Sequence, residues 1–324
     1  MIRVYFLIAV GVLAVLGAVI GDKYFIHILI LCFIWSMVVA GWDLVLGYAG
    51  IVNFAQLVFF AVGAYGSSMA AMSLGAPSIT PLLVGMGCAG VVGLLIGLPC
   101  LRLRGEFIAL FTFTVHLALP PLIRQGRPIG TGGATGLLGV PPLEIGDFAL
   151  VAQNKLAWFY VTLCVAAVAI YIIYFVIVPG RWGKAFVAMR DSEDFAKSLG
   201  INYYRYKLVV FVVSAMITGL AGALYAHYVI VVTPKILGTE FFLIVMVMLS
   251  VGGLGRFPGV ILGAFIVTIG NEWLREVGQY RLLLLGLAVV LIILFMPKGI
   301  VALPDQFQRL KLKRFSISDR KSEE

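Results

Sequence analysis

Runs of about 20 apolar residues recur from one end of this chain to the other, and each is long enough to cross a bilayer as a helix. Of the 324 residues, 62% are hydrophobic and only 12% are charged, which is too little charge to cover the surface of a soluble domain. The runs are also too long for transmembrane strands, and they lack the alternation of apolar and polar residues that strands need. The sequence therefore predicts an all-α polytopic membrane protein.

We expect about ten transmembrane segments. The segments near 238–253 and 257–272 are short and are separated by GGLGRFPG, so they form either two spans or one re-entrant pair. The connection GYAG at 47–50 is either a very short loop or a break inside the membrane. The expected segments are about 4–20, 24–46, 51–74, 79–98, 106–123, 157–178, 207–231, 238–253, 257–272 and 281–296.

The Lys and Arg residues are concentrated in connections that alternating spans place on one side of the membrane. This bias predicts that both termini are cytoplasmic. It also explains the net charge of +9 without a nucleic-acid partner, because the basic residues lie in loops beside apolar spans and form no patch. We expect residues 1–301 to form the transmembrane domain and residues 302–324 to form a polar cytoplasmic tail, whose KLKR cluster lies against lipid headgroups.

The segment 181–207, RWGKAFVAMRDSEDFAKSLGINYYRYK, is a charged island between two apolar runs. Residues 184–200 fit one amphipathic helix, which Gly200 ends as a left-handed C′ glycine. This helix rests either in a groove of another protein or on lipid headgroups, and its spacing does not distinguish the two. Glu193 and Asp194 either pair with a partner or belong to a solvated pairing with Lys197. The apolar face of the helix consists of Phe186, Met189, Ala196 and Leu199.

A polar, glycine-interrupted patch lies in an otherwise apolar region near residue 48. Its acid, Asp43, is either functional or satisfies backbone N–H groups freed at a helix break, and we favour the second interpretation. Unwound backbone inside a membrane is tolerated only beside protein or a water-filled cavity, so the patch is the best candidate for a translocation pathway. Helix packing with an interhelical amide bond is the equal alternative. The patch comprises Asp43, Gly47, Tyr48, Asn53 and Gln56.

Motifs for catalysis or for metal binding are missing from the sequence. There is no GxxxxGK[ST] phosphate loop, so this chain does not hydrolyse ATP alone. The 4 cysteines and 3 histidines are scattered over separate apolar segments, so we expect no metal site. An ion-coupled secondary transporter remains a distant alternative, for which Asp43 is the strongest candidate residue.

Five blocks of the sequence resemble the LivM-type permeases of branched-chain amino acid ABC importers. The island, AFVAMRDSEDFAKSLGINYYRYKLVVF followed by SAMITGLAGALYA, resembles the signature of that family. The other blocks are GYAGIVNFAQLVFFAVGAY (47–65), LRLRGEFIALFTF with the later TGGATGLLGVP, GGLGRFPGVILGA (252–264) and FMPKGI (295–300). Residues 51–56 depart from the Ser-centred pattern of the family and carry the Asn-Phe-Ala sequence of its LivH-type partners, so substrate identity does not transfer directly.

The resemblance implies a type II-like ABC importer permease in the bacterial inner membrane. Its implied partners are a homologous LivH-type permease in a heterodimer, two ATP-binding subunits of the LivG/LivF type, a periplasmic substrate-binding protein and membrane lipid. The chain itself would bind no cofactor, because the partner ATPases use the ATP and Mg. Its substrates would be branched-chain amino acids, and the alternatives are urea, short amides or small aromatic carboxylates.

The resemblance also gives a role to the charged island. In the family the island is the coupling helix that contacts the ATPase subunits. The corresponding residues here are Phe186, Met189, Arg190, Glu193, Asp194, Ala196, Lys197 and Gly200. On the predicted topology, the external connection 124–156 contacts the binding protein, gates the outer mouth or is a plain flexible loop. Its candidate contact residues are Thr131, Gly132, Gly133, Thr135 and Gly136.

Overall fold

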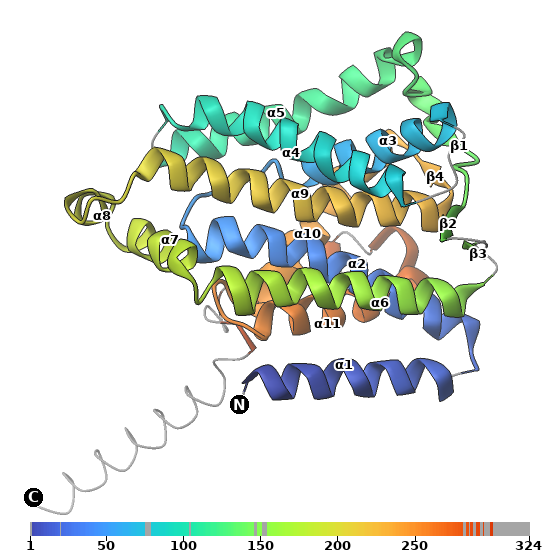
Figure 1. Ribbon diagram of the computed structural model, residues 1–324. Coiled ribbons are helices and arrows are strands. Elements are labelled where there is room, and N and C mark those ends of the chain that lie inside the picture. Colours follow the sequence, from blue (N-terminus) through green and yellow to red (C-terminus); the bar gives the residue numbers. More distant parts are fainter. Residues whose placement is uncertain are drawn as a thin grey trace, which may run out of the picture.

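The computed structural model shows a bundle of helices that run alongside one another (Figure 1). It describes residues 2–300 except 20, 75–78, 104, 146–147, 151–153 and scattered positions between 281 and 298. The predicted polar tail 302–324 and much of the predicted segment 281–296 lie outside the described residues.

The helices of the bundle match the expected segments closely in number and position over residues 2–273. The long elements are α1 (Ile2–Val19), α2 (Lys23–Asp43) continued by the π-helix η1 (Leu44–Tyr48), α3 (Gln56–Leu74), α4 (Thr80–Cys100), α5 (Glu106–Gln125), α6 (Lys155–Tyr171) continued by the π-helix η4 (Ile172–Ile177), α9 (Tyr203–Val229), α10 (Thr239–Gly252) and α11 (Gly259–Trp273). Five of these are long and apolar enough to cross a membrane, namely Lys23–Tyr48, Thr80–Cys100, Glu106–Gln125, Lys155–Ile177 and Tyr203–Val229.

Helix α2 forms the centre of the bundle. It contacts α6, α9, α10 and α11, and its residues from Ile28 to Asp43 are almost all buried. Its sequence is apolar on every side, which is the pattern of a helix surrounded by other helices. The end of this helix is therefore enclosed by protein and is a suitable place for a polar contact that must exclude lipid.

Small residues allow α3, α4 and α9 to pack closely. A Cβ atom on Gly63 would overlap the backbone of Gly219, and one on Gly222 would overlap the carbonyl oxygen of Phe60. Close approach of backbones through glycine is a common way for membrane helices to associate. The small residues of SAMITGLAGA (214–223) therefore serve helix packing.

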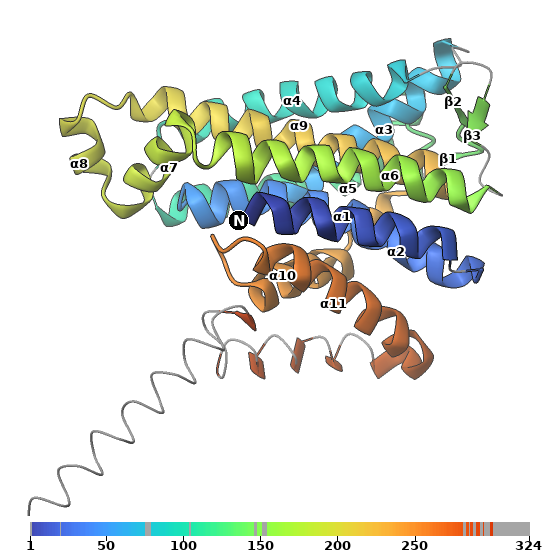
Figure 2. The same cartoon turned by 60° about the horizontal axis from the view of Figure 1, so that its bottom comes forward.

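Helices α10 and α11 pack against each other on one side of the bundle (Figure 2). Gly255, just before α11, donates its N–H to Asp43 Oδ1 (2.7 Å) near the end of α2. Glu272 Oε1, near the end of α11, accepts a hydrogen bond from the Tyr24 hydroxyl at the start of α2 (2.8 Å). The segment from Gly255 to Glu272, which contains α11, therefore contacts both ends of α2.

The two ends of the bundle differ in structure. One end carries the short helices α7 (Arg181–Asp191) and α8 (Glu193–Ser198), and the other carries the strands (Figure 1). There β1 (Leu137–Leu138) pairs with β4 (Val231–Val232), and β2 (Leu143–Ile145) pairs with β3 (Phe148–Leu150), both antiparallel. The 3₁₀ turns η2 (Arg127–Ile129), η3 (Gly133–Thr135) and η5 (Pro234–Leu237) lie in the connections, and η6 (Leu274–Tyr280) follows α11.

The start of α3 differs from the expected segment 51–74. The helix begins at Gln56, and residues 51–55 are non-helical. Gly50 has a φ of +69°, which turns the chain after η1, and the Asn53 Oδ1 atom accepts a hydrogen bond from the Ala55 N–H (2.9 Å). A local bond from an Asn side chain to the backbone competes with helix formation, which explains the late start.

Candidate functional site

The charged island forms two helices where the sequence predicted one helix over 184–200. Helix α7 ends at Asp191 and α8 begins at Glu193, with Ser192 in extended conformation between them (φ −163°, ψ 117°). The Ser192 carbonyl accepts the Ala196 N–H (3.0 Å), so Ser192 occupies the N-cap position of α8. Serine is a favoured N-cap residue, and the acids Glu193 and Asp194 in the first turn suit the positive end of a helix dipole.

The end of α8 follows the sequence prediction. Gly200 has a φ of +76°. Its N–H bonds to the Lys197 carbonyl (3.0 Å), and the Ile201 N–H bonds to the Ala196 carbonyl (3.1 Å). This pair of bonds is a Schellman motif, which fixes the direction of the chain as it enters α9.

The apolar face of the island is turned toward this chain. Phe186 is 1% exposed and contacts the ring of Tyr206 in α9, and Met189 and Ala196 are also buried. These three residues are therefore unavailable to a partner protein or to lipid, which corrects the expected docking face. Leu199 differs, because it is 60% exposed.

The polar face of the island is the accessible one. Lys197 Nζ pairs with Glu193 Oε1 (2.7 Å), and both side chains are partly exposed. The hydrogen bond from Lys197 to the Glu193 carboxylate raises the pKa of the Lys197 ammonium. Asp194 is exposed beside this pair. The expected i,i+4 pairing is present, and it leaves charges of both signs available to a partner.

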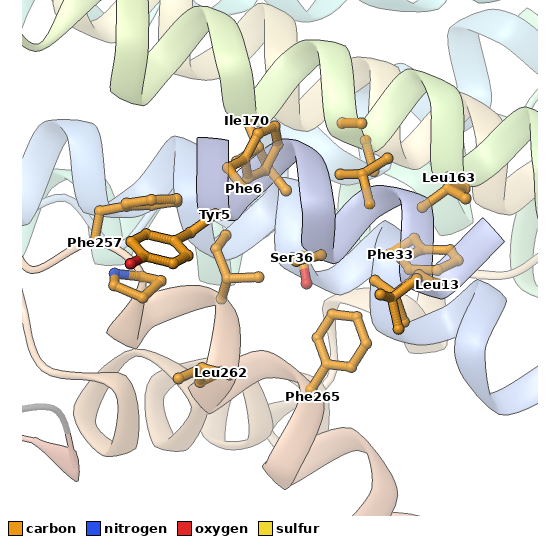
Figure 3. A pocket seen from close by; sticks show the side chains of 17 residues that line it. Tyr5, Phe6, Leu13, Phe33, Ser36, Leu163, Ile170, Phe257, Leu262 and Phe265 are labelled. Carbon is orange, nitrogen blue, oxygen red and sulfur yellow. The ribbon is translucent and has the colours of Figure 1, made fainter. Parts of the chain in front are cut away.

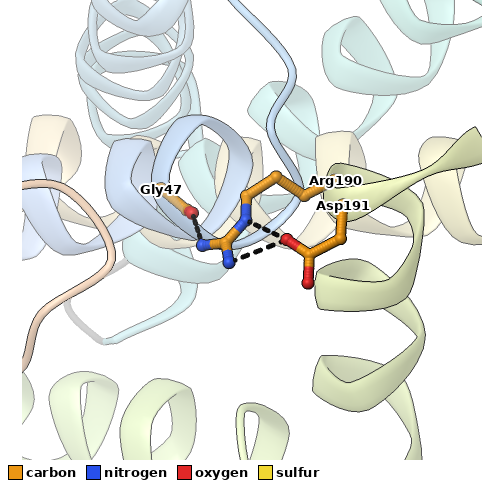
Figure 4. A network of polar contacts seen from close by, with 3 residues as sticks. All are labelled: Gly47, Arg190 and Asp191. Atoms are coloured by element: carbon orange, nitrogen blue, oxygen red, sulfur yellow. Dashed lines mark hydrogen bonds and ion pairs between the residues drawn. The ribbon is translucent and has the colours of Figure 1, made fainter.

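Arg190 connects the island to the central helix. Its Nη1 atom donates to the Gly47 carbonyl oxygen in η1 (2.9 Å), while Nε and Nη2 donate to Asp191 Oδ1 (3.1 and 3.0 Å) (Figure 4). A Cβ atom on Gly50 would lie 2.5 Å from the Arg190 Cγ atom. Glycine at that position therefore lets the Arg190 side chain lie flat against the turn that follows η1.

Asp43 lies one helical turn before Gly47 and is fully buried. Its Oδ1 atom accepts the Gly255 N–H (2.7 Å), and its Oδ2 atom accepts the Tyr174 hydroxyl (3.0 Å). A Cβ atom on Gly47 would overlap Asp43 Oδ1 and would lie 2.5 Å from the Gly255 nitrogen. Asp43 thus accepts a backbone N–H that is freed at a helix break, as expected. The break is the one at GGLGRFPG, which contains Gly255, and not the nearby one at GYAG (47–50).

We call this set of contacting residues the glycine junction; it consists of Asp43, Gly47, Tyr174, Arg190 and Gly255. Both π-helices meet here, because Gly47 belongs to η1 and Tyr174 to η4. π-Helical turns occur frequently at functional sites. Sequence reasoning missed Tyr174 and Gly255. The only available signal was the second glycine-rich break, GGLGRFPG.

Two pathway candidates, Asn53 and Gln56, are enclosed within the chain. The Asn53 carbonyl accepts the Trp42 Nε1–H (2.6 Å). Gln56 Nε2 donates to Ser214 Oγ (3.1 Å) and to Thr218 Oγ1, both in α9. The geometry favours the packing alternative for Gln56, whose buried amide bonds to α9. The Asn53 side chain is also fully buried, but its only side-chain bond is the local one to the Ala55 N–H, and its Nδ2 atom has no hydrogen-bond partner among the described residues. Tyr48 is partly exposed and stacks edge-on against Tyr174 (6.1 Å between centroids).

The external candidates form a tight turn against the bundle. Thr131 Oγ1 donates to the Ile123 carbonyl of α5 (2.8 Å), and Thr135 Oγ1 donates to the Gly132 carbonyl (2.8 Å). Gly136 has a φ of +74°, and a Cβ atom there would overlap the Val232 carbonyl oxygen. Gly132 and Gly133 also have positive φ angles. The segment is therefore held by specific contacts within the chain, and its contact with a binding protein stays a prediction.

A bundle with five helices that are long and apolar enough to cross a membrane is the architecture of a polytopic membrane protein. Residues 24–296 match the family described as branched-chain amino acid transport system, permease component, and the chain belongs to that family. It is thus a multi-pass permease component of a branched-chain amino acid ABC transport system and is not itself an enzyme.

Curated relatives agree with this family. The high-affinity branched-chain amino acid transport system permease LivM of Escherichia coli is 29% identical over 95% of this chain and 76% of that protein. The LivH permease of the same organism is 24% identical over 84% of this chain and 92% of its own length. The ribose import permease RbsC of Haemophilus influenzae is 22% identical over 79% of each chain. No solved structure gives a significant match.

Proposed function

We propose that this chain is one of two homologous permeases that together import branched-chain amino acids across the bacterial inner membrane. The second permease is of the LivH type. Two ATP-binding subunits use ATP and Mg, and a periplasmic binding protein delivers the substrate. The chain binds no cofactor. It crosses the membrane about ten times with both termini in the cytoplasm, in the manner of a type II-like importer. The chain is similar to both LivM and LivH of Escherichia coli, which carry the name of the same transport system, and this supports a pair of homologous permeases.

The observation that carries the mechanism is the bond from Arg190 to Gly47. Arg190 lies on the helix that would meet an ATPase, and Gly47 lies at the end of the most enclosed of the five candidate spans. A displacement of α7 by an ATPase therefore acts directly on the end of α2. Asp43 extends this effect to the connection between α10 and α11 through Gly255.

The same contacts argue against ion coupling through Asp43. Both carboxylate oxygens are engaged, one by Gly255 and one by Tyr174. A carboxylate that binds and releases an ion in each cycle would have to break two bonds inside a closely packed junction.

The substrate class is tested with the purified four-subunit complex and its binding protein in proteoliposomes. ATP hydrolysis is measured with leucine, urea and a small aromatic acid such as benzoate. Stimulation by leucine alone is the expected result. Stimulation by urea or benzoate without leucine would replace the proposed substrate and leave the permease assignment unchanged.

A further inference from the structure

An apolar crevice of about 620 Å³ lies between α1, α2, α6 and α11 (Figure 3). Its walls include Phe6 of α1, Phe33 of α2, Ala167 of α6 and Leu262 of α11. Ser36 also lines the crevice, but its hydroxyl donates to the Cys32 carbonyl of its own helix (2.7 Å). A water molecule needs two or more polar partners, so a crevice with these walls is a poor site for water.

The depth of the crevice corresponds to one leaflet of a bilayer. Its lining residues extend over 5–13 on α1 and over 257–265 on the opposite wall. Eight residue steps of a helix cover about 12 Å, and half of a bilayer's hydrocarbon core is about 15 Å thick. Phe257 lies two residues after Gly255, so this end of the crevice adjoins the glycine junction. On the proposed topology that end faces the cytoplasm.

Arg3 lies near this end of the crevice, and Arg256 is next to a lining residue in the chain. Arg3 Nη2 donates to the Phe175 carbonyl (3.1 Å), and the Phe175 ring contacts the rings of Phe6 and Phe257 (5.3 Å in each case). A guanidinium has five N–H donors, and the bond to Phe175 uses one of them. Arg256 precedes Phe257 in the chain and is exposed. Basic pockets between helices on the cytoplasmic side of a membrane bind anionic headgroups.

We propose that the crevice is a lipid site that holds one acyl chain of an anionic inner-leaflet phospholipid, whose phosphate lies at Arg3. An acyl chain is apolar, as the walls of the crevice are. It also spans one leaflet, which is about the depth of the crevice. The charge of the phosphate complements the guanidinium of Arg3 at this end of the crevice. The lipid would lie between α1 and α11 and fill a space that the helices leave open.

The test uses native mass spectrometry of the intact complex, purified in mild detergent with equal amounts of phosphatidylglycerol and phosphatidylethanolamine. Ala9→Phe and Ala167→Phe each fill the crevice, from α1 and from α6. The matched control is Val168→Phe, at a neighbouring α6 position that is 53% exposed and lies outside the crevice lining. The melting temperature of each variant complex shows whether it is folded.

The wild type and the control are expected to retain one phosphatidylglycerol molecule. The filled variants should retain about tenfold less phosphatidylglycerol. This factor corresponds to roughly two methylenes of the acyl chain that are no longer buried in the crevice. Arg3→Gln should retain a lipid but lose the preference for phosphatidylglycerol.

Equal retention by the filled variants would overturn the site, and equal retention of both lipids by the wild type would overturn the headgroup assignment. Lipid bound to the isolated chain but not to the complex would also overturn the site, because a partner subunit would then cover the crevice. None of these results depends on transport, so the proposed function stands or fails separately.

Discussion

Replacement of Arg190 by Gln is the most direct test of the glycine junction. The change removes the charged bond to the Gly47 carbonyl (2.9 Å) and the ion pair with Asp191 (3.0 Å). A hydrogen bond to a charged group contributes about 1.5–3 kcal/mol, and an exposed ion pair between neighbours contributes about 0–1 kcal/mol. The Arg190 side chain is 39% exposed, so solvent screening reduces the effect of its loss to about 1 kcal/mol.

A loss of about 1 kcal/mol changes an equilibrium about fivefold. If this energy holds α7 against the end of α2, the Arg190→Gln complex should import about fivefold less leucine per ATP hydrolysed. Its ATPase rate should persist, because the substitution does not alter the ATP-binding subunits. Leucine import and phosphate release are measured on the same proteoliposomes, which contain the binding protein.

The matched control is Lys184→Gln, which removes one exposed cation from the same helix. It should leave the ratio of leucine to ATP unchanged. A normal ratio in Arg190→Gln, or an equal loss in both variants, would refute the argument, because the effect would then come from the charge of the island and not from the bond to Gly47.

The remaining predictions concern the island and the helix contacts. Glu193→Lys breaks an exposed ion pair and reverses a charge on the accessible face, so the complex should stay in the membrane but hydrolyse ATP without import; normal uptake of labelled leucine would contradict this. Gln56→Leu removes the amide that joins α3 to α9 and should lower the free energy of unfolding by about 1–2 kcal/mol. The melting temperature of the purified chain should fall, and an unchanged melting temperature would show that the amide contributes nothing. The methyl group of Gly63→Ala would overlap the backbone of Gly219 and should lower the free energy of unfolding by about 1–3 kcal/mol. The yield of folded protein should fall in Gly63→Ala but not in the control Gly11→Ala, where a Cβ meets nothing within 4 Å, and equal yields would count against close packing.

The positions of the helices could be predicted from sequence because each depends on a local property. An apolar run of sufficient length needs no partner to indicate a span. The end of α8 could also be predicted, because glycine adopts the left-handed conformation of a helix end without strain, and Gly200 is visible in the sequence. The break at Ser192 had an equally local signal, a serine followed by two acids, which the apolar spacing of the island obscured.

The burial of the island's apolar face could not be predicted in the same way. The spacing of Phe186 and Met189 shows that one side of α7 avoids water, but it does not identify what covers that side. The answer depends on the direction in which α9 leaves the island, and that direction is set by the turn at Gly200 and Ile201. The resemblance identified the segment correctly as a family block but did not indicate which of its faces is accessible.

Asp43 shows the same limit for a polar residue. A buried carboxylate needs hydrogen-bond partners, and the nearby break at GYAG suggested that its backbone N–H groups are those partners. The actual partners, Tyr174 and Gly255, are 131 and 212 residues away in the chain. Only the packing of α6 and α11 against α2 brings them together.

The arrangement of the glycine junction limits how this permease can move. Gly47 lacks a side chain, and the Asp43 carboxylate and the Gly255 backbone occupy the space that a side chain would need. The end of α2 and the connection before α11 are therefore interlocked, and Arg190 attaches α7 to the same point. Packed cores change between discrete arrangements and do not deform continuously. We therefore expect α7, the end of α2 and the α10–α11 connection to be displaced together, so that a push on the island reaches helices on both sides of α2.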